Sequence, residues 1–97
     1  MRRWLKSLTA EDRRTIGVDI ATVEYGWPVG MPVCSAITSR RGLWEVRSVL
    51  ADSRIARVLF CIHDGRMVLL HGFIKKTQQT RDSDLNLAVK RKKEIER

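Results

Sequence analysis

The stretch that decides the fold is Gly42-Leu43-Trp44-Glu45-Val46-Arg47. It is followed by Ile55-Ala56-Arg57-Val58-Leu59-Phe60 and then by Leu69-Leu70-His71-Gly72-Phe73-Ile74-Lys75-Lys76-Thr77. These apolar segments, separated by short polar turns, predict antiparallel strands. Each segment also contains basic or imidazole side chains that a fully buried strand would exclude. The repeated arginines therefore indicate a sheet face that is held open for an anionic ligand.

The turns between these segments predict how the strands align. Asp64-Gly65 favours a type I′ hairpin, because both residues tolerate positive φ angles. This turn would place Arg57 opposite Gly72, and a three-residue turn after Leu50 would place Arg47 opposite Arg57. Side-chain alternation then sorts the polar residues onto two faces. The first face would contain Arg57, Leu59, Gly72, Ile74 and Lys76. The second face would contain His71, Phe73 and Lys75.

The predicted alignment gathers Arg47, Arg57 and Lys76 around Gly72. Like charges opposite each other on neighbouring strands are unfavourable unless an anion or a carboxylate neutralises them. A glycine between them would remove a side chain and let a backbone approach closely. The alternative is structural: Glu45 pairs with one arginine while the other arginine extends to solvent.

The rest of the chain predicts helices around this sheet, in a single domain of 97 residues. A short helix is expected from Arg2 to Leu8. Thr9 is a suitable N-cap for a second helix from Ala10 to about Tyr25. The glycine- and proline-rich segment 26–42 is expected to be mostly loop, and Asp84 is expected to cap a final helix.

The charge balance narrows the choice of partners. Nineteen Lys and Arg residues against eleven Asp and Glu residues give a net charge of +8. This favours nucleic acid, an acidic protein or an anionic membrane surface, although some basic proteins have no such role. Cys34 and Cys61 lack a metal-site spacing, so neither a metal nor another cofactor is predicted. With no apolar run near the ~20 residues of a membrane span and no signal peptide, no membrane contact is expected and a cytoplasmic location is predicted.

Individual side chains allow both structural and functional interpretations. His71 could transfer protons, because an unperturbed imidazole has a pKa of about 6.5, or could be a plain rim residue. Phe73 could pack in the core or stack on an RNA base. The basic run from Lys90 to Lys93 is expected to be a solvated helix face that adds to the positive field.

The three quoted segments resemble successive strands of the RelE/HigB toxin superfamily, in its phage-derived HigB-like branch. Trp4-Leu5-Lys6-Ser7-Leu8 resembles the first helix of that family, and the pattern around Ala88, Arg91 and Ile95 resembles its last. The resemblance implies an α+β fold in which two N-terminal helices pack on a small twisted antiparallel sheet, with a C-terminal helix. The family's usual first strand is expected to be absent, which would leave an open sheet edge and favour a homo-oligomer.

The resemblance also implies a function. It implies the toxin of a type II toxin–antitoxin pair, a metal-independent endoribonuclease that cuts messenger RNA on the ribosome and is neutralised by a cognate antitoxin. The catalytic candidates are Arg47, Arg57, Lys76 and His71, of which the first three match basic strand positions of the family. The RNA-binding candidates are Lys75, Phe73, Lys90 and Arg91. Because segment 81–97 contains no Tyr, His or Phe, two alternatives stay open: a ParE-like gyrase inhibitor and an inactive phage-derived binding module.

Overall fold

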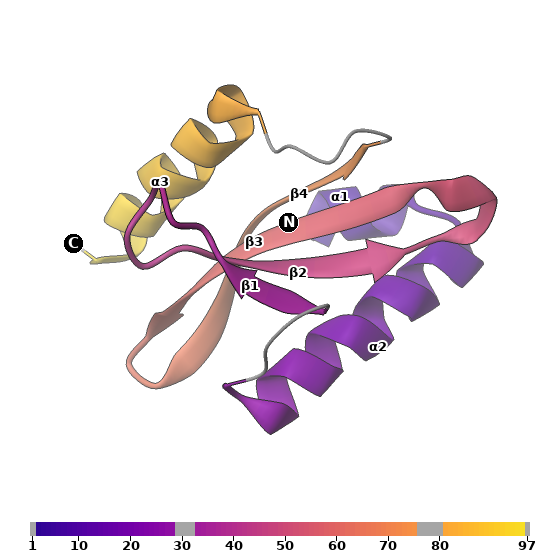
Figure 1. Cartoon of the computed structure of the whole chain (residues 1–97), viewed down its shortest axis with the longest axis horizontal. Coiled ribbons are helices and arrows are strands. Elements are labelled where there is room, and N and C mark those ends of the chain that lie inside the picture. The colour runs from indigo at the N-terminus through magenta and orange to yellow at the C-terminus, as the bar shows by residue number, and fades with distance from the viewer. Residues whose placement is uncertain (1, 29–32, 76–80, 97) are drawn as a thin grey trace.

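The structure is a computed structural model that describes residues 2–28, 33–75 and 81–96. Its helices are α1 (Arg2–Ser7), α2 (Ala10–Gly26) and α3 (Asp82–Glu96). Its strands are β1 (Cys34–Ala36), β2 (Trp44–Val49), β3 (Ile55–His63) and β4 (Arg66–Lys75). The strands form one antiparallel sheet in the order β1-β2-β3-β4, with α2 and α3 on opposite sides (Figure 1). The predicted α+β fold, with two N-terminal helices and a C-terminal helix, is confirmed.

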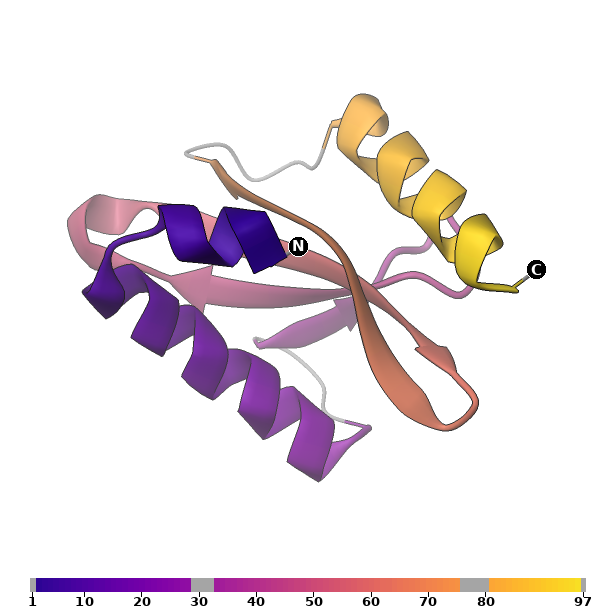
Figure 2. The same ribbon diagram turned by 180° about the vertical axis from the view of Figure 1, so that it is seen from behind.

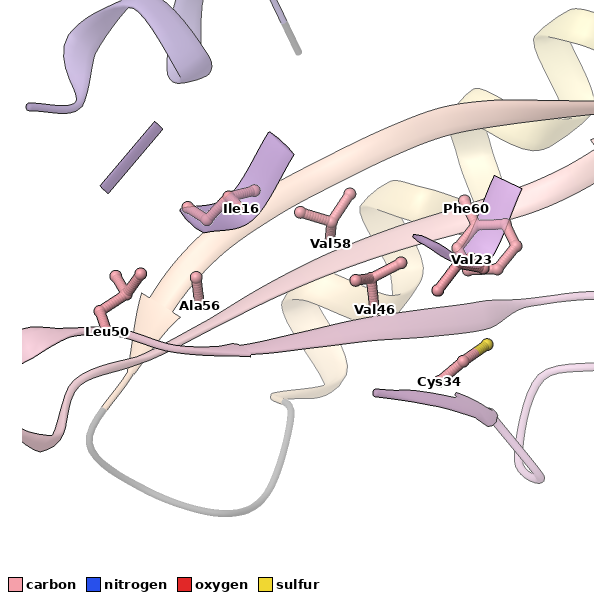
Figure 3. Packing of buried hydrophobic residues seen from close by; sticks show 8 residues of the cluster. All are labelled: Ile16, Val23, Cys34, Val46, Leu50, Ala56, Val58 and Phe60. Atoms are coloured by element: carbon pink, nitrogen blue, oxygen red, sulfur yellow. The ribbon is translucent and has the colours of Figure 1, made fainter. Parts of the chain in front are cut away.

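Both faces of the sheet are covered by helices. The cluster beneath α1 and α2 has as its buried members Ile16, Val23, Cys34, Val46, Leu50, Ala56, Val58 and Phe60 (Figure 3). The cluster beneath α3 has as its buried members Leu43, Leu59, Cys61, Leu70, Leu85 and Ala88. Seen from behind, α1 and α2 lie together over their face of the sheet (Figure 2). Each large apolar side chain buried in this way contributes roughly 1.5–3 kcal/mol to folding.

Helix α2 begins where its sequence predicts. Thr9 has extended backbone angles, and its Oγ1 accepts a hydrogen bond from the backbone N of Asp12 at 3.1 Å. The Asp12 carboxylate is paired with Arg54, whose Nη1 and Nη2 lie 3.0 and 3.1 Å from its two oxygens. This pair, in which Asp12 is buried and Arg54 is partly exposed, joins the start of α2 to the end of the 3₁₀ turn Ala51–Ser53 that follows β2.

Helix α1 packs against β4 through a glycine. A Cβ atom on Gly72 would lie only 2.5 Å from two ring carbons of Trp4, so only glycine allows this contact. The prediction that Gly72 lies on the same face as Arg47 and Arg57 was wrong, because Gly72 pairs with Val58. Gly72 faces the α1 side of the sheet, where it makes room for the indole ring.

The hairpin between β3 and β4 forms as predicted, but a bulge then shifts the register. Asp64 and Gly65 both have positive φ, and His63 pairs with Arg66. Between the Phe60 and Leu59 pairs one extra residue enters β4, so that Arg57 pairs with Phe73. The predicted pairing of Arg57 with Gly72 was therefore wrong by one residue, and the predicted division of faces was wrong with it.

Two further elements differ from the sequence prediction. Strand β1, Cys34–Ala36, lies in the segment that was expected to be mostly loop, and its pairing with β2 draws it into the sheet. Helix α3 begins at Asp82 rather than after Asp84, because the backbone N of Leu85 donates to the carbonyl O of Arg81. Among the described residues, no helix combines the length and the apolar character needed to cross a lipid bilayer.

Candidate active site

The α3 side of the sheet brings together most of the predicted site residues whose side chains the structure describes. Arg47 of β2 lies opposite Arg57 of β3, as predicted, and Phe73 of β4 lies opposite Arg57 on its other side. Residues that are paired directly across strands share a face of the sheet. The polar and aromatic residues that share this face, which we call the charged face, are Glu45, Arg47, Arg57, His71 and Phe73.

Arg57 is buried against Glu45. The two residues are only 6% and 5% exposed, and Nη1 of Arg57 donates to Oε1 of Glu45. This is the pairing that the structural alternative predicted for one of the arginines. Removing one member of a buried ion pair destabilises a protein strongly. Glu45 therefore holds the guanidinium in place, and a phosphate would have to compete with this carboxylate for Arg57.

Arg47 is the more accessible of the two arginines. It lines a groove of about 530 Å³ between α2 and the outer edge of β2. The other residues lining the groove are Thr15, Asp19, Val33 and Val49. The Nε atom of Arg47 is buried and has no hydrogen-bond partner in the described part of the chain. Arg47 and Arg57 are paired across the two strands, but their side chains have different surroundings. Arg57 lies in a buried ion pair, and Arg47 lines an open groove.

His71 is paired with a carboxylate from α3. Its Nε2 lies 2.8 Å from Oδ1 of Asp84, and the two side chains are 17% and 19% exposed. The ring of Phe73 lies beside the imidazole, with 5.5 Å between centroids and a 35° tilt. A carboxylate bound to one ring nitrogen favours the tautomer in which that nitrogen holds the proton, so the other nitrogen can accept one.

The remaining basic candidates occupy different surroundings. Arg91 is half-buried, and its Nη1 donates to the backbone carbonyl of Leu70 at 2.7 Å, which joins α3 to β4. Lys90 is exposed on α3. Lys75 is the last residue of β4, opposite Ile55. Lys76 lies outside the described residues.

Asp84 is a site residue that the sequence does not reveal, because its position predicts a helix cap. It lies in the first turn of α3, and its carboxylate contacts His71 rather than serving as the N-cap. The spacing of Asp84 and Arg91 does contain one indication of the site. The two residues are seven positions apart, so they lie on the same face of the helix. Which strand that face meets depends on the docking of α3, for which the local sequence has no pattern.

The two cysteines are not suited to act as nucleophiles at this site. Burial raises the pKa of the Cys34 thiol, and the nearby Glu45 carboxylate raises it further. Burial also raises the pKa of the Cys61 thiol, an effect that Lys92 opposes in part. Only the thiolate is an effective nucleophile or metal ligand, so both cysteines behave as small core residues. The described residues also contain no cluster of three or more His, Cys, Asp or Glu side chains that could hold a metal ion.

Chemically, the charged face offers a proton acceptor and an aromatic ring beside the buried cation of Arg57, while the more accessible cation, Arg47, lines the groove next to α2. The imidazole of His71 can accept a proton, the guanidinium of Arg47 can bind an anion, and the ring of Phe73 can stack on a base. These groups suit a reaction at a phosphodiester.

Comparison with known proteins identifies the family. Residues 3–93 match the family model described as "Phage derived protein Gp49-like (DUF891)". No curated protein and no solved structure matches the chain. Since the family model matches nearly the whole chain, from α1 to the last turns of α3, the chain belongs to the phage-derived Gp49-like family, a family of RelE/HigB-like toxins.

Proposed function

We propose that this protein is the toxin of a type II toxin–antitoxin pair, of the HigB-like branch, and that it cuts messenger RNA on the ribosome without a metal ion. Family membership supports the toxin assignment. The observation that carries the nuclease assignment is the pairing of His71 with Asp84 at 2.8 Å, on the same sheet face as Arg57 and Phe73.

The proposed reaction is an in-line attack of the ribose 2′-oxygen on the adjacent phosphorus. It requires a base for the 2′-OH proton, cations for the charge that develops on the phosphoryl oxygens, and a proton for the departing 5′-oxygen. In our proposal His71 takes the 2′-OH proton, and Arg57 and Arg47 stabilise the phosphoryl group. Lys76 is proposed as a further phosphate ligand or as the acid.

RNA binding is assigned to residues around this centre. Phe73 is proposed to stack on a base next to the cleaved bond, since an aromatic ring beside an imidazole is a suitable platform. Lys75 and Lys90 are proposed to neutralise neighbouring phosphates. Arg91 donates to the Leu70 carbonyl, so we propose that it contributes mainly through its positive charge.

The proposal includes a protein partner. A net charge of +8 favours an acidic cognate antitoxin. Strand β4 is the last strand of the sheet within the described residues, so its outer edge is where a strand from the antitoxin or from a second copy would add. The substrate places the proposed action in the bacterial cytoplasm.

Inducible expression in bacteria tests this proposal. The wild-type chain, His71→Gln and His63→Gln are expressed, growth is followed, and the 5′ ends of messenger RNA are mapped. His63→Gln is the matched control, because His63 is the chain's other histidine and lies at the β3–β4 turn, next to the exposed Asp64.

We expect new 5′ ends within translated codons for the wild type and for His63→Gln, and none for His71→Gln, with all three proteins folded by circular dichroism. Growth arrest with intact transcripts would refute the nuclease and favour a gyrase inhibitor of the ParE type. Normal growth with intact transcripts would refute the toxin and favour an inactive binding module.

A further inference from the structure

A bulge in β4 determines where His71 points. Leu59 pairs with His71 while the next residue of β3, Phe60, pairs with Leu69, so Leu70 is the extra residue. A bulge sends two successive side chains towards the same face, and bulges often lie next to active sites. Leu70 is 2% exposed in the cluster beneath α3. The bulge therefore turns His71 onto the charged face, the side opposite to the one that strict alternation predicted.

Helix α3 holds this bulge at two successive residues. Arg91 donates to the backbone carbonyl of Leu70 at 2.7 Å, and Asp84 contacts the imidazole of His71 at 2.8 Å. Asp84 and Arg91 are two helical turns apart and lie on the same side of α3. One contact fixes the backbone before His71, and the other fixes its ring.

The first turn of α3 is itself anchored. Leu85, next to Asp84, is only 5% exposed in the cluster beneath the helix. Arg40, from the loop between β1 and β2, donates to Oδ1 of Asn86 at 3.1 Å and lies 3.8 Å from Asp82. The carboxylate that meets His71 thus comes from a rigid turn, which is what a preorganised site requires.

We propose that Asp84 is a positioning residue that acts through His71. Its carboxylate accepts a hydrogen bond from Nε2–H, which keeps the proton on Nε2, leaves the Nδ1 lone pair as the base, and stabilises the imidazolium that forms. The role of Asp84 in RNA cleavage rests on the proposed function, whereas its effect on the tautomer of His71 does not.

In the assigned step every bond is accounted for. The ribose 2′-OH proton moves to Nδ1 of His71 as the 2′-oxygen forms a bond to phosphorus. The bond from phosphorus to the 5′-oxygen breaks, and the 5′-oxygen takes a proton from the general acid or from water. The products are a 2′,3′-cyclic phosphate and a 5′-hydroxyl, and the imidazolium later returns its proton to solvent.

Other charged groups lie on the elements packed around His71. They are Glu45 of β2, Arg57 of β3 and Arg91 of α3. Glu45 and Arg57 are paired with each other, and Arg91 donates to the Leu70 carbonyl. Asp84 is the carboxylate that contacts the imidazole, at 2.8 Å, so its neutralisation is the direct test.

Asp84→Asn tests the proposal, since it keeps the shape of the side chain and removes its charge. Asp64→Asn is the matched control, because it alters the chain's other His–Asp contact, 3.4 Å from His63 at the exposed turn. The tautomer of His71 is measured by ¹⁵N NMR of the imidazole. RNA cleavage by purified protein on translating ribosomes is measured from pH 5 to 9, and urea unfolding checks the stability of each variant.

We expect the Nε2–H tautomer in the wild type and in Asp64→Asn. For Asp84→Asn we expect a mixture of tautomers and cleavage reduced by about 10²–10⁴-fold. Asp84→Glu should restore part of the rate. An unchanged tautomer in Asp84→Asn would refute the proposal, as would a rate loss that only follows stability. If the wild type cuts no RNA, the proposed function fails, and the NMR result alone decides the role of Asp84.

Discussion

At the scale of single residues, the pairing of Arg57 with Glu45 changes how this site has to be tested. An arginine that is 6% exposed and paired with a buried carboxylate is part of the protein's framework as well as a candidate phosphate ligand. Replacing Arg57 by alanine would therefore lower both the stability and the activity of the protein, so a loss of activity would not identify a catalytic role. Arg47, half-buried beside an open groove, does not have this problem.

Arg57→Ala removes the buried cation beside Glu45, and we expect the free energy of unfolding to fall by about 3–5 kcal/mol. The double variant Glu45→Gln/Arg57→Met removes both charges. We expect it to regain most of the free energy of unfolding that Arg57→Ala loses. Urea unfolding of the wild type, the single variant and the double variant measures both effects. Equal stability of Arg57→Ala and the wild type would contradict this account, as would a double variant that is no more stable than the single one.

At the scale of the elements, close backbone packing and one bulge determine how the helices meet the sheet. Gly72 lets α1 approach β4, and the extra residue Leu70 lets β4 present His71 to α3. The same ten-residue strand therefore binds a helix on each of its faces.

Gly72→Ala should destabilise the protein by about 1–3 kcal/mol, because the new methyl group would lie 2.5 Å from the Trp4 ring. Gly17→Ala is the control. A Cβ atom there meets nothing within 4 Å, and alanine in the middle of α2 should add up to ~1 kcal/mol. Thermal unfolding of both variants measures the difference. If Gly72→Ala were as stable as Gly17→Ala, the close packing of α1 on β4 would be wrong.

Local chemistry predicted some elements and could not predict others. Thr9 and Asp64-Gly65 act through hydrogen bonds and φ angles within a few residues, so their sequence predicts them correctly. The bulge at Leu70 has no local signal, because Leu69-Leu70 is also an ordinary strand sequence. β1 forms through long-range pairing with β2, and the contact of Asp84 with His71 depends on where α3 docks. These long-range contacts determine the site's final geometry.

At the scale of the whole molecule, two buried thiols link folding to pH. Burial raises the pKa of both Cys34 and Cys61 in the folded state above the unfolded values, which are near 8.5. A group whose pKa is raised by folding stabilises the protein fully below its unfolded pKa. That contribution is lost as the pH rises through the folded pKa.

We therefore expect the free energy of unfolding to fall as the pH rises from about 8 to 10. The fall should be smaller in Cys34→Ala/Cys61→Ala, although that variant starts from a lower stability because its core has lost volume. Urea titrations at pH 7.5 and 9.5 measure the two slopes under reducing conditions. Parallel losses in both proteins would show that the thiols make no contribution.

The most direct test of the central claim uses purified protein, ribosomes translating a defined messenger RNA, and analysis of the RNA ends. We predict cuts within translated codons that leave a 5′-hydroxyl and a 2′,3′-cyclic phosphate, in the presence of a metal chelator that leaves the ribosomes intact. The cuts should disappear with His71→Gln and persist with His63→Gln. Intact messenger RNA with the wild-type protein, or equal cutting by His71→Gln, would contradict the account.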